Sequence, residues 1–161
     1  GEVKQGNIYS SNKFITQKGL DNSSAKLFPK DTVVIAMYGA TAGDVGILRF
    51  ETSTNQAVCG ILPNDILIPE FIYYSFSYRK NELIAQATGN AQPNISQTKI
   101  KNTLIPILEK KEQLKIIEEL DSLKEQTKQL ENHYKQKLKN LEELKKSILQ
   151  KAFSGELLND S

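Results

Sequence analysis

The feature that most constrains this chain is a heptad pattern of apolar residues in its last third. Two series of residues, each spaced by seven, interleave between Ile116 and Ile148, and eight of the ten positions are apolar or aromatic. No Pro or Gly interrupts the run before Gly155. A period of 3.5 residues sustained over several heptads predicts a coiled-coil helix. Its predicted seam consists of Ile116, Leu120, Leu123, Leu130, Tyr134, Leu141, Leu144 and Ile148.

This predicted helix needs a partner. A helix from about Glu109 to Ala152 would be roughly 65 Å long at about 1.5 Å per residue, which is too long to fold back on a small domain. The sequence contains no second helix of similar length. The stripe therefore predicts self-association or docking onto another protein, although a simple spacer is an alternative. Thr127 and Lys137 are the polar seam positions, and isolated polar residues in a seam can set its register.

Composition restricts the remaining possibilities. The chain has 161 residues, of which 39% are hydrophobic and 25% are charged, and these values are typical of a soluble protein with one compact domain beside the helix. The most apolar stretch, residues 32–38, is far shorter than the roughly 20 residues of a membrane span. No signal peptide is recognised. The single cysteine, Cys59, cannot form an internal disulfide, so we expect a reducing, cytoplasmic location.

The first two thirds of the sequence predict short strands and one helix. Apolar and β-branched runs between turn residues predict the strands, and Pro69 opens an amphipathic segment that Thr88-Gly89-Asn90 would end. The expected fold class is α+β, a β-rich domain followed by one long coiled-coil helix. The expected domains are 1–107 for the β-rich domain, 108–154 for the helix and 155–161 for a flexible tail. The expected elements are strands at 32–38, 45–50, 57–62 and 100–107, and a helix at 69–87.

The sequence predicts no enzyme active site. The glycines of GATAGDVG lack the Gly-Lys-Ser/Thr ending of a phosphate-binding loop. With one histidine, His133 on the long helix, and one cysteine, there is no zinc-ligand cluster. Cys59 lies in an apolar strand-like segment without a nearby base, which indicates a buried structural residue and not a nucleophile. We therefore expect a binding module without a metal or cofactor.

Two segments are rich in side-chain amides and hydroxyls, residues 52–57 (TSTNQA) and 88–99 (TGNAQPNISQTK). Asn and Gln can bond adenine bidentately in the major groove, and Ser, Thr and Lys can contact phosphates. The alternative is that these residues only form turns and cap the backbone. The net charge of +2 does not decide between these interpretations.

Several motifs, taken in order, resemble a known family. These motifs are IAMYGATAGDVGIL, TNQAVCGILPN, GNAQPNISQTKIKNTLIPI, EQLKIIEELDSL and LKKSILQKAFSGEL, and together they span most of the chain. Each motif is modest alone, but the ordered set resembles the specificity subunit of type I restriction-modification enzymes. The resemblance implies that residues 1–107 form a target recognition domain and that the long helix is the conserved spacer region.

The resemblance also implies function and partners. Such a subunit catalyses nothing and needs no cofactor. It positions methyltransferase and motor-nuclease (restriction) subunits on a bipartite double-stranded DNA target. The complete enzyme would be an adenine-N6 DNA methyltransferase and an ATP-dependent endonuclease. A complete subunit carries two recognition domains and two antiparallel helices. This chain resembles one half, it lacks upstream residues that the family has, and it lacks a second proline near the helix start. Two copies related by a two-fold axis would rebuild the missing half as a homodimer.

The position of residues within these motifs gives the candidate DNA contacts. We expect Gly39 and Gly43 to allow a tight turn. The rival interpretation is a coiled-coil adaptor whose globular head binds protein and has no DNA role. The candidate DNA-binding residues are Tyr38, Thr41, Asn55, Gln56, Asn90, Gln92, Asn94, Gln97, Lys99 and Lys101.

Overall fold

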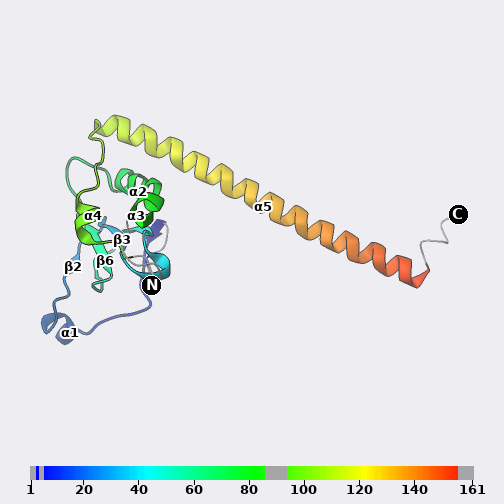
Figure 1. The fold of residues 1–161 in the computed structure, drawn as a ribbon, viewed down its shortest axis with the longest axis horizontal. Coiled ribbons are helices and arrows are strands. Elements are labelled where there is room, and N and C mark those ends of the chain that lie inside the picture. Colours follow the sequence, from blue (N-terminus) through cyan, green and yellow to red (C-terminus); the bar gives the residue numbers. More distant parts are fainter. Residues whose placement is uncertain (1–2, 4–5, 86–93, 156–161) are drawn as a thin grey trace. The chain divides into compact units, whose positions relative to one another are not determined.

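The computed structural model of the protein describes residues 3, 6–85 and 94–155, and the chain divides into two compact units, Gly1–Ile117 and Glu118–Ser161 (Figure 1). We call them the globular unit and the helical unit. The globular unit combines small sheets with short helices, and the helical unit contains the greater part of one long helix. The predicted α+β class is confirmed. The expected domain division at residue 107 stays a prediction.

A four-stranded sheet forms the centre of the globular unit, with strand order β1-β4-β3-β6. Strand β1 (Gly6–Ile8) is parallel to β4 (Val45–Leu48), whereas β3 (Val33–Ala36) is antiparallel to both β4 and β6 (Val58–Ile61). Strands at 32–38, 45–50 and 57–62 were predicted, and all three are confirmed. The parallel contact of β1 was not predicted from the sequence.

Both faces of this sheet are covered, which explains why β3 is apolar at every position. Val33 and Ile35 point into the main core with the buried Ile72, Phe76 and Ile95, whereas Val34 belongs to a smaller cluster on the other side. A strand buried on both faces is expected to be a continuous apolar run and not an alternating one.

A two-stranded ribbon contributes to this smaller cluster. It consists of β2 (Leu27–Phe28) and β5 (Thr52–Ser53), which are antiparallel. The ring of Phe28 lies over Gly60 of β6, where an added Cβ would be only 2.6 Å from the ring. Glycine is therefore required at position 60 for the ribbon to approach the sheet. The short helix α1 (Gln17–Asp21) lies in the connection before the ribbon.

Helices cover the main core. The predicted helix is observed as α2 (Pro69–Tyr78) and α3 (Lys80–Ala85), with Arg79 at the end of α2. The predicted strand at 100–107 is wrong. Residues Gln97–Lys101 form helix α4, and no strand is assigned in the segment from 102 to 109. The Ser96 side chain caps α4 by accepting a hydrogen bond from the backbone N–H of Lys99, and this cap favours a helix.

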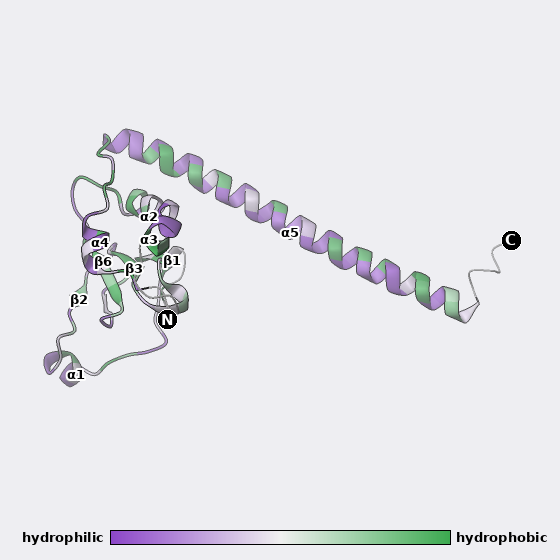
Figure 2. Cartoon of the chain, viewed as in Figure 1, coloured by the Kyte–Doolittle hydropathy of each residue, from purple (hydrophilic) through white to green (hydrophobic). Residues whose placement is uncertain are grey.

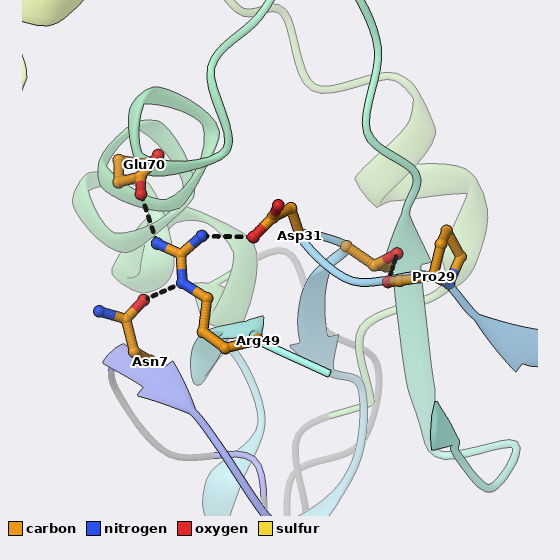
Figure 3. Close-up of polar contacts among 6 residues, drawn as sticks. Asn7, Pro29, Asp31, Arg49 and Glu70 are labelled. Carbon is orange, nitrogen blue, oxygen red and sulfur yellow. Dashed lines mark hydrogen bonds and ion pairs between the residues drawn. The ribbon is translucent and has the colours of Figure 1, made fainter. Parts of the chain in front are cut away.

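One arginine ties three elements of the globular unit together (Figure 3). Arg49, which follows β4, donates from Nε to Oδ1 of Asn7 on β1 at 2.8 Å and from Nη1 to Oδ1 of Asp31 at 2.6 Å. Its Nη2 donates to the carboxylate of Glu70 in the first turn of α2. Burial alone would lower the pKa of Arg49, because it disfavours the charged guanidinium. The hydrogen bonds and negative charges of Glu70 and Asp31 outweigh this effect, so the pKa of Arg49 is raised.

The long helix α5 (Lys110–Ser154) begins within the globular unit, and Gln113 fixes this beginning. Gln113 is fully buried, and its Oε1 accepts a hydrogen bond from the backbone N–H of Ile68 at 2.9 Å. Its Nε2 donates to the backbone carbonyls of Ile66 and Leu108, both at 2.8 Å. One amide thereby satisfies two backbone groups just before α2 and one just before α5. Ile117 is the other buried residue of α5.

The helical unit continues α5 without interruption, which confirms the predicted helix. Figure 2 shows apolar residues recurring along α5 among hydrophilic ones. Beyond Ile117 every described side chain of α5 is at least partly exposed, and the seam leucines from Leu123 onward are about half exposed. Within the described residues, no helix is both long enough and apolar enough to cross a membrane.

Candidate nucleic-acid interface

Three segments that are distant in the sequence meet at the carboxyl end of β3. The backbone N–H of Met37 donates to the carbonyl of Ala57 at 2.8 Å, and the N–H of Ile95 donates to the carbonyl of Met37 at 2.9 Å. Tyr38 and Asn94 form an isolated antiparallel bridge. This end of the sheet therefore brings together parts of the two segments rich in side-chain amides and hydroxyls, residues 52–57 and 88–99.

The connection between β3 and β4 contributes the first group of side chains. Tyr38 is 44% exposed, and the short 3₁₀ turn Gly39–Thr41 follows it. Gly39 and Gly43 have φ angles of 74° and 80°, a conformation that strongly favours glycine. The expected tight turn is therefore observed. It presents the Tyr38 ring to solvent, while Thr41 is half-buried.

The turn before β6 contributes the second group. The side-chain Oδ1 of Asn55 accepts a hydrogen bond from the backbone N–H of Ala57 at 3.1 Å. This contact is the backbone capping that the alternative interpretation describes, so the Asn55 oxygen already has a local role. Gln56 is exposed, and none of the hydrogen bonds among the described residues involves its amide. Of the two side chains, Gln56 is the one with a free amide for a ligand.

Residues 94–97 contribute the third group. Asn94 is exposed beside Tyr38, and Ile95 is fully buried and anchors the segment in the core. Gln97, although exposed, hydrogen-bonds the Cys59 side chain. Burial raises the pKa of the Cys59 thiol, and the bond to Gln97 and the charge of Lys101 act in the opposite direction. Cys59 is therefore a buried structural residue, as the sequence indicated.

The two predicted lysines of α4 have different surroundings. Lys101 is exposed, whereas Lys99 is half-buried and lines a groove of about 650 Å³ between α3 and α4. Arg79 lies in the same groove and was not among the residues predicted from the sequence to bind DNA. Among the described residues, its guanidinium makes one weak hydrogen bond, from Nη1 to the Ser75 carbonyl at 3.4 Å. The neighbouring Lys80 instead forms an ion pair with Asp44 at 2.5 Å.

The groove combines charge with polar side chains. Ser96, Thr98, Asn102 and Thr103 line it together with Arg79 and Lys99, and Glu82 contributes one carboxylate. Hydroxyls, amides and cations of this kind are the groups that contact phosphates. The sequence shows that Arg79 is charged, but not that it lies in this groove, because its position there depends on tertiary packing. Asn90 and Gln92 lie outside the described residues.

Comparison with known proteins gives a consistent result. The model of a family described as the type I restriction modification DNA specificity domain matches residues 3–140. The specificity subunit of the Escherichia coli type I restriction enzyme EcoR124I/EcoR124II is 25% identical over 119 residues, which cover 71% of this chain and 30% of that protein. The MjaIX specificity subunit of Methanocaldococcus jannaschii is 31% identical over 104 residues, covering 63% of this chain and 24% of that protein.

The likeness extends to solved structures. A chain from a structure of a type I R-M system superimposes with a TM-score of 0.69 at 23% identity, covering 80% of this chain and 32% of that chain. At this identity the likeness shows the fold alone. The chain therefore spans about a quarter to a third of the length of the relatives described above.

Proposed function

The chain belongs to the family of type I restriction modification DNA specificity domains, and from this premise we propose that it is the target-reading part of a non-catalytic specificity subunit. The globular unit recognises one half of a bipartite sequence in double-stranded DNA. The helical unit holds this reader at a set distance from a second one. Family membership disfavours the rival interpretation of an adaptor that has no role in DNA recognition.

The observation that carries this proposal is the meeting of three polar segments at the end of β3. Tyr38, Gln56 and Asn94 come from different parts of the chain, and backbone hydrogen bonds to Met37 and the Tyr38–Asn94 bridge hold their segments in place. Exposed amides on a rigid scaffold are suited to reading base edges, for which Asn and Gln pair with adenine. Lys99, Lys101 and Arg79 supply positive charge for the phosphates.

The partners follow from the same premise. The proposed assembly contains methyltransferase and restriction subunits, which carry out the chemistry, in the cytoplasm where they meet DNA. Two copies of the chain associate through α5, because its seam is otherwise exposed to water over most of its length. Contiguous exposed apolar surface of this kind marks an interaction site.

Titration of a fluorescent duplex of random sequence tests the DNA-binding role. The variants Lys99→Gln, Lys101→Gln and Arg79→Gln should each weaken binding to every sequence. Each lost phosphate contact should also reduce the slope of log affinity against log salt by about 0.9. Lys115→Gln is the matched control, because Lys115 is an exposed lysine at the start of α5 and away from the groove.

Gln56→Ala tests the reading role separately. We expect a reduced preference between sequences, worth about 1–3 kcal/mol for a bidentate base contact, with little change in the salt slope. Binding that is identical for the parent and all four variants would remove these residues from the interface. A chain that binds no duplex at any salt concentration would overturn the proposed function.

A further inference from the structure

The turn that carries Tyr38 is held in place by one neighbouring helix. We propose that Lys80 of α3 and Asp44 form a positioning pair, which keeps Tyr38 where it contacts the bases, and that neither side chain of the pair binds DNA itself. We call residues 38–43 the Tyr38 turn. The inference rests on the proposed function, in which this end of the sheet reads one half of a DNA target.

The Tyr38 turn has a backbone path that is fixed by its own hydrogen bonds. The N–H of Gly43 donates to the carbonyl of Ala36 at 2.8 Å, and the N–H of Asp44 donates to the carbonyl of Thr41 at 2.9 Å. Both bonds lie within residues 36–44. The orientation of the turn relative to the helices therefore depends on other contacts.

Helix α3 packs directly against the turn at Gly43. A Cβ added to Gly43 would lie 2.9 Å from Cγ of Lys80 and 3.5 Å from two carbon atoms of Ile84. Gly43 is buried, and Ile84 packs against the main core. Because position 43 has no side chain, α3 can approach the backbone of the turn closely.

The Lys80 side chain also joins α3 to the residue after the turn. Its Nζ forms an ion pair with Oδ1 of Asp44 at 2.5 Å, and the side chains of Lys80 and Asp44 are 34% and 18% exposed. A charge-assisted hydrogen bond between partly buried groups is stronger than an exposed ion pair and is screened less by salt. Lys80 thus contacts this region twice, through its carbon chain at Gly43 and through its ammonium group at Asp44.

Lys80 differs from its neighbour Arg79, although both residues are cations at the junction of α2 and α3. Arg79 lines the groove between α3 and α4, which is the proposed site of a DNA phosphate. The charge of Lys80 is instead neutralised by the carboxylate of Asp44. A phosphate would have to compete with this carboxylate for Lys80. The two adjacent residues therefore have separate roles in the proposed interface.

Another side of α3 contributes to the groove itself. Glu82 and Leu83 line the groove, whereas Lys80 and Ile84 contact the Tyr38 turn. Helix α3 therefore connects the residues proposed to read bases with those proposed to bind phosphates. This connection matters because phosphate contacts fix the position of a protein on the duplex, and base contacts depend on that position. A recognition site that is loose by about 1 Å already loses function.

A positioning role predicts a loss of sequence preference without a loss of general affinity. Breaking the pair leaves the cations of the groove in place, so binding to random DNA and its dependence on salt should stay the same. The Tyr38 turn would then occupy several positions, and contacts with the preferred bases would be lost. Either substitution breaks the same contact, so both should have the same effect.

The affinities of the full chain for two duplexes test this prediction. The first is the duplex that the parent protein enriches most strongly from a pool of randomised sequence, and the second has the same bases in scrambled order. Lys80→Met keeps the carbon chain beside Gly43 and removes the positive charge, and Asp44→Asn removes the negative charge. In each variant the ratio of the two affinities should fall about tenfold, which is the order of one lost base contact. The slope of log affinity against log salt for the scrambled duplex should not change.

Three further variants complete the comparison. The double variant should lose no more preference than either single variant, because both substitutions remove one shared contact. Lys80→Arg should retain the preference, because its guanidinium keeps the positive charge beside Asp44. Lys135→Met is the matched control. Lys135 forms an exposed ion pair with Glu131 at 2.7 Å in the helical unit, and its loss should change neither the preference nor the salt slope.

Hydrogen exchange measures the effect on the turn without DNA. In Lys80→Met the amide of Gly43 should exchange severalfold faster, because the turn opens more often. The amide of Arg49, which donates to the Ile8 carbonyl at 2.8 Å beyond the other end of β4, should exchange as in the parent. Equal acceleration at both amides would indicate general destabilisation and would overturn a local positioning role.

Two results would overturn the role of the pair and leave the proposed function intact. The first is a Lys80→Met variant that keeps the sequence preference of the parent. The second is a Lys80→Met variant whose salt slope falls by about 0.9, together with an Asp44→Asn variant that binds every duplex more tightly, because this would identify Lys80 as a phosphate contact. A parent chain that binds neither duplex would overturn the proposed function, and the reading role of the pair with it.

Discussion

The globular unit and the helical unit bury their apolar residues in different ways. In the globular unit, Val33, Ile35 and Val45 are fully buried, and the sheet is covered on both faces within the same chain. In the helical unit, Leu130 and Leu141 remain more than half exposed although their side chains are equally apolar. The spacing of the residues makes the difference, because short continuous apolar runs form strands that are buried on both faces within one chain, whereas heptads form a seam for another helix.

The two units therefore have different sources of stability. The globular unit has a core of its own, so its stability is intrinsic to one chain. A long, uncovered helix has few tertiary contacts, and in proteins most helix stability comes from packing of the apolar face. The stability of the helical unit should therefore depend on the concentration of the chain, whereas that of the globular unit should not.

The largest expected effect concerns the helical unit. Leu130→Asp places a charge in the centre of the seam and should convert the proposed dimer into monomers, because a buried unpaired charge is strongly unfavourable. Light scattering measures the change. Lys128→Asp is the control, since it introduces the same side chain outside the seam and should leave the dimer intact. An unchanged Leu130→Asp dimer would contradict the seam.

Truncation of the sheet core should have the next largest effect. Ile35→Ala removes three carbon atoms from a fully buried site and should lower the free energy of unfolding of the globular unit by about 2–5 kcal/mol. Urea denaturation followed by near-ultraviolet circular dichroism measures this loss. The matched truncation Leu141→Ala should weaken association and leave the unfolding of the globular unit nearly unchanged. Equal losses in both variants would show that the two units do not differ in the way proposed.

A smaller effect is expected at Gln113, where α5 begins. Gln113→Met keeps the length of the side chain but leaves the N–H of Ile68 and the carbonyls of Ile66 and Leu108 without their partner. We expect a loss of about 2–4 kcal/mol, because buried unsatisfied polar groups are costly. Hydrogen exchange at the Ile68 amide should accelerate. Gln126→Met, at an exposed position of the same helix, should change neither quantity.

Elements with a strong periodicity could be predicted from the sequence, whereas short segments that depend on tertiary contacts could not. β3, β4, β6 and α5 were predictable because several consecutive residues repeat one pattern. The segment at 100–107 has the apolar composition of a strand, but Ile100 is buried as part of helix α4, which Ser96 caps. The backbone N–H of Ile95 also donates a hydrogen bond to the carbonyl of Met37. The contact between Tyr38 and Asn94 joins distant parts of the chain. No local pattern indicates such a pairing, and the same holds for Arg79 in the groove and for the amide of Gln113.

The smallest expected effect is a pH dependence that belongs to the globular unit alone. Burial raises the pKa of the Cys59 thiol, so the folded unit retains this proton at a pH where the unfolded chain begins to release it. The contribution to stability is fully present below the ordinary thiol pKa and is lost as the pH rises through the raised value in the folded state. The parent should therefore lose more stability at alkaline pH than Cys59→Ala, which has no thiol to titrate. Urea midpoints at neutral and alkaline pH measure this difference, and an equal alkaline loss in both proteins would rule out Cys59 as its source.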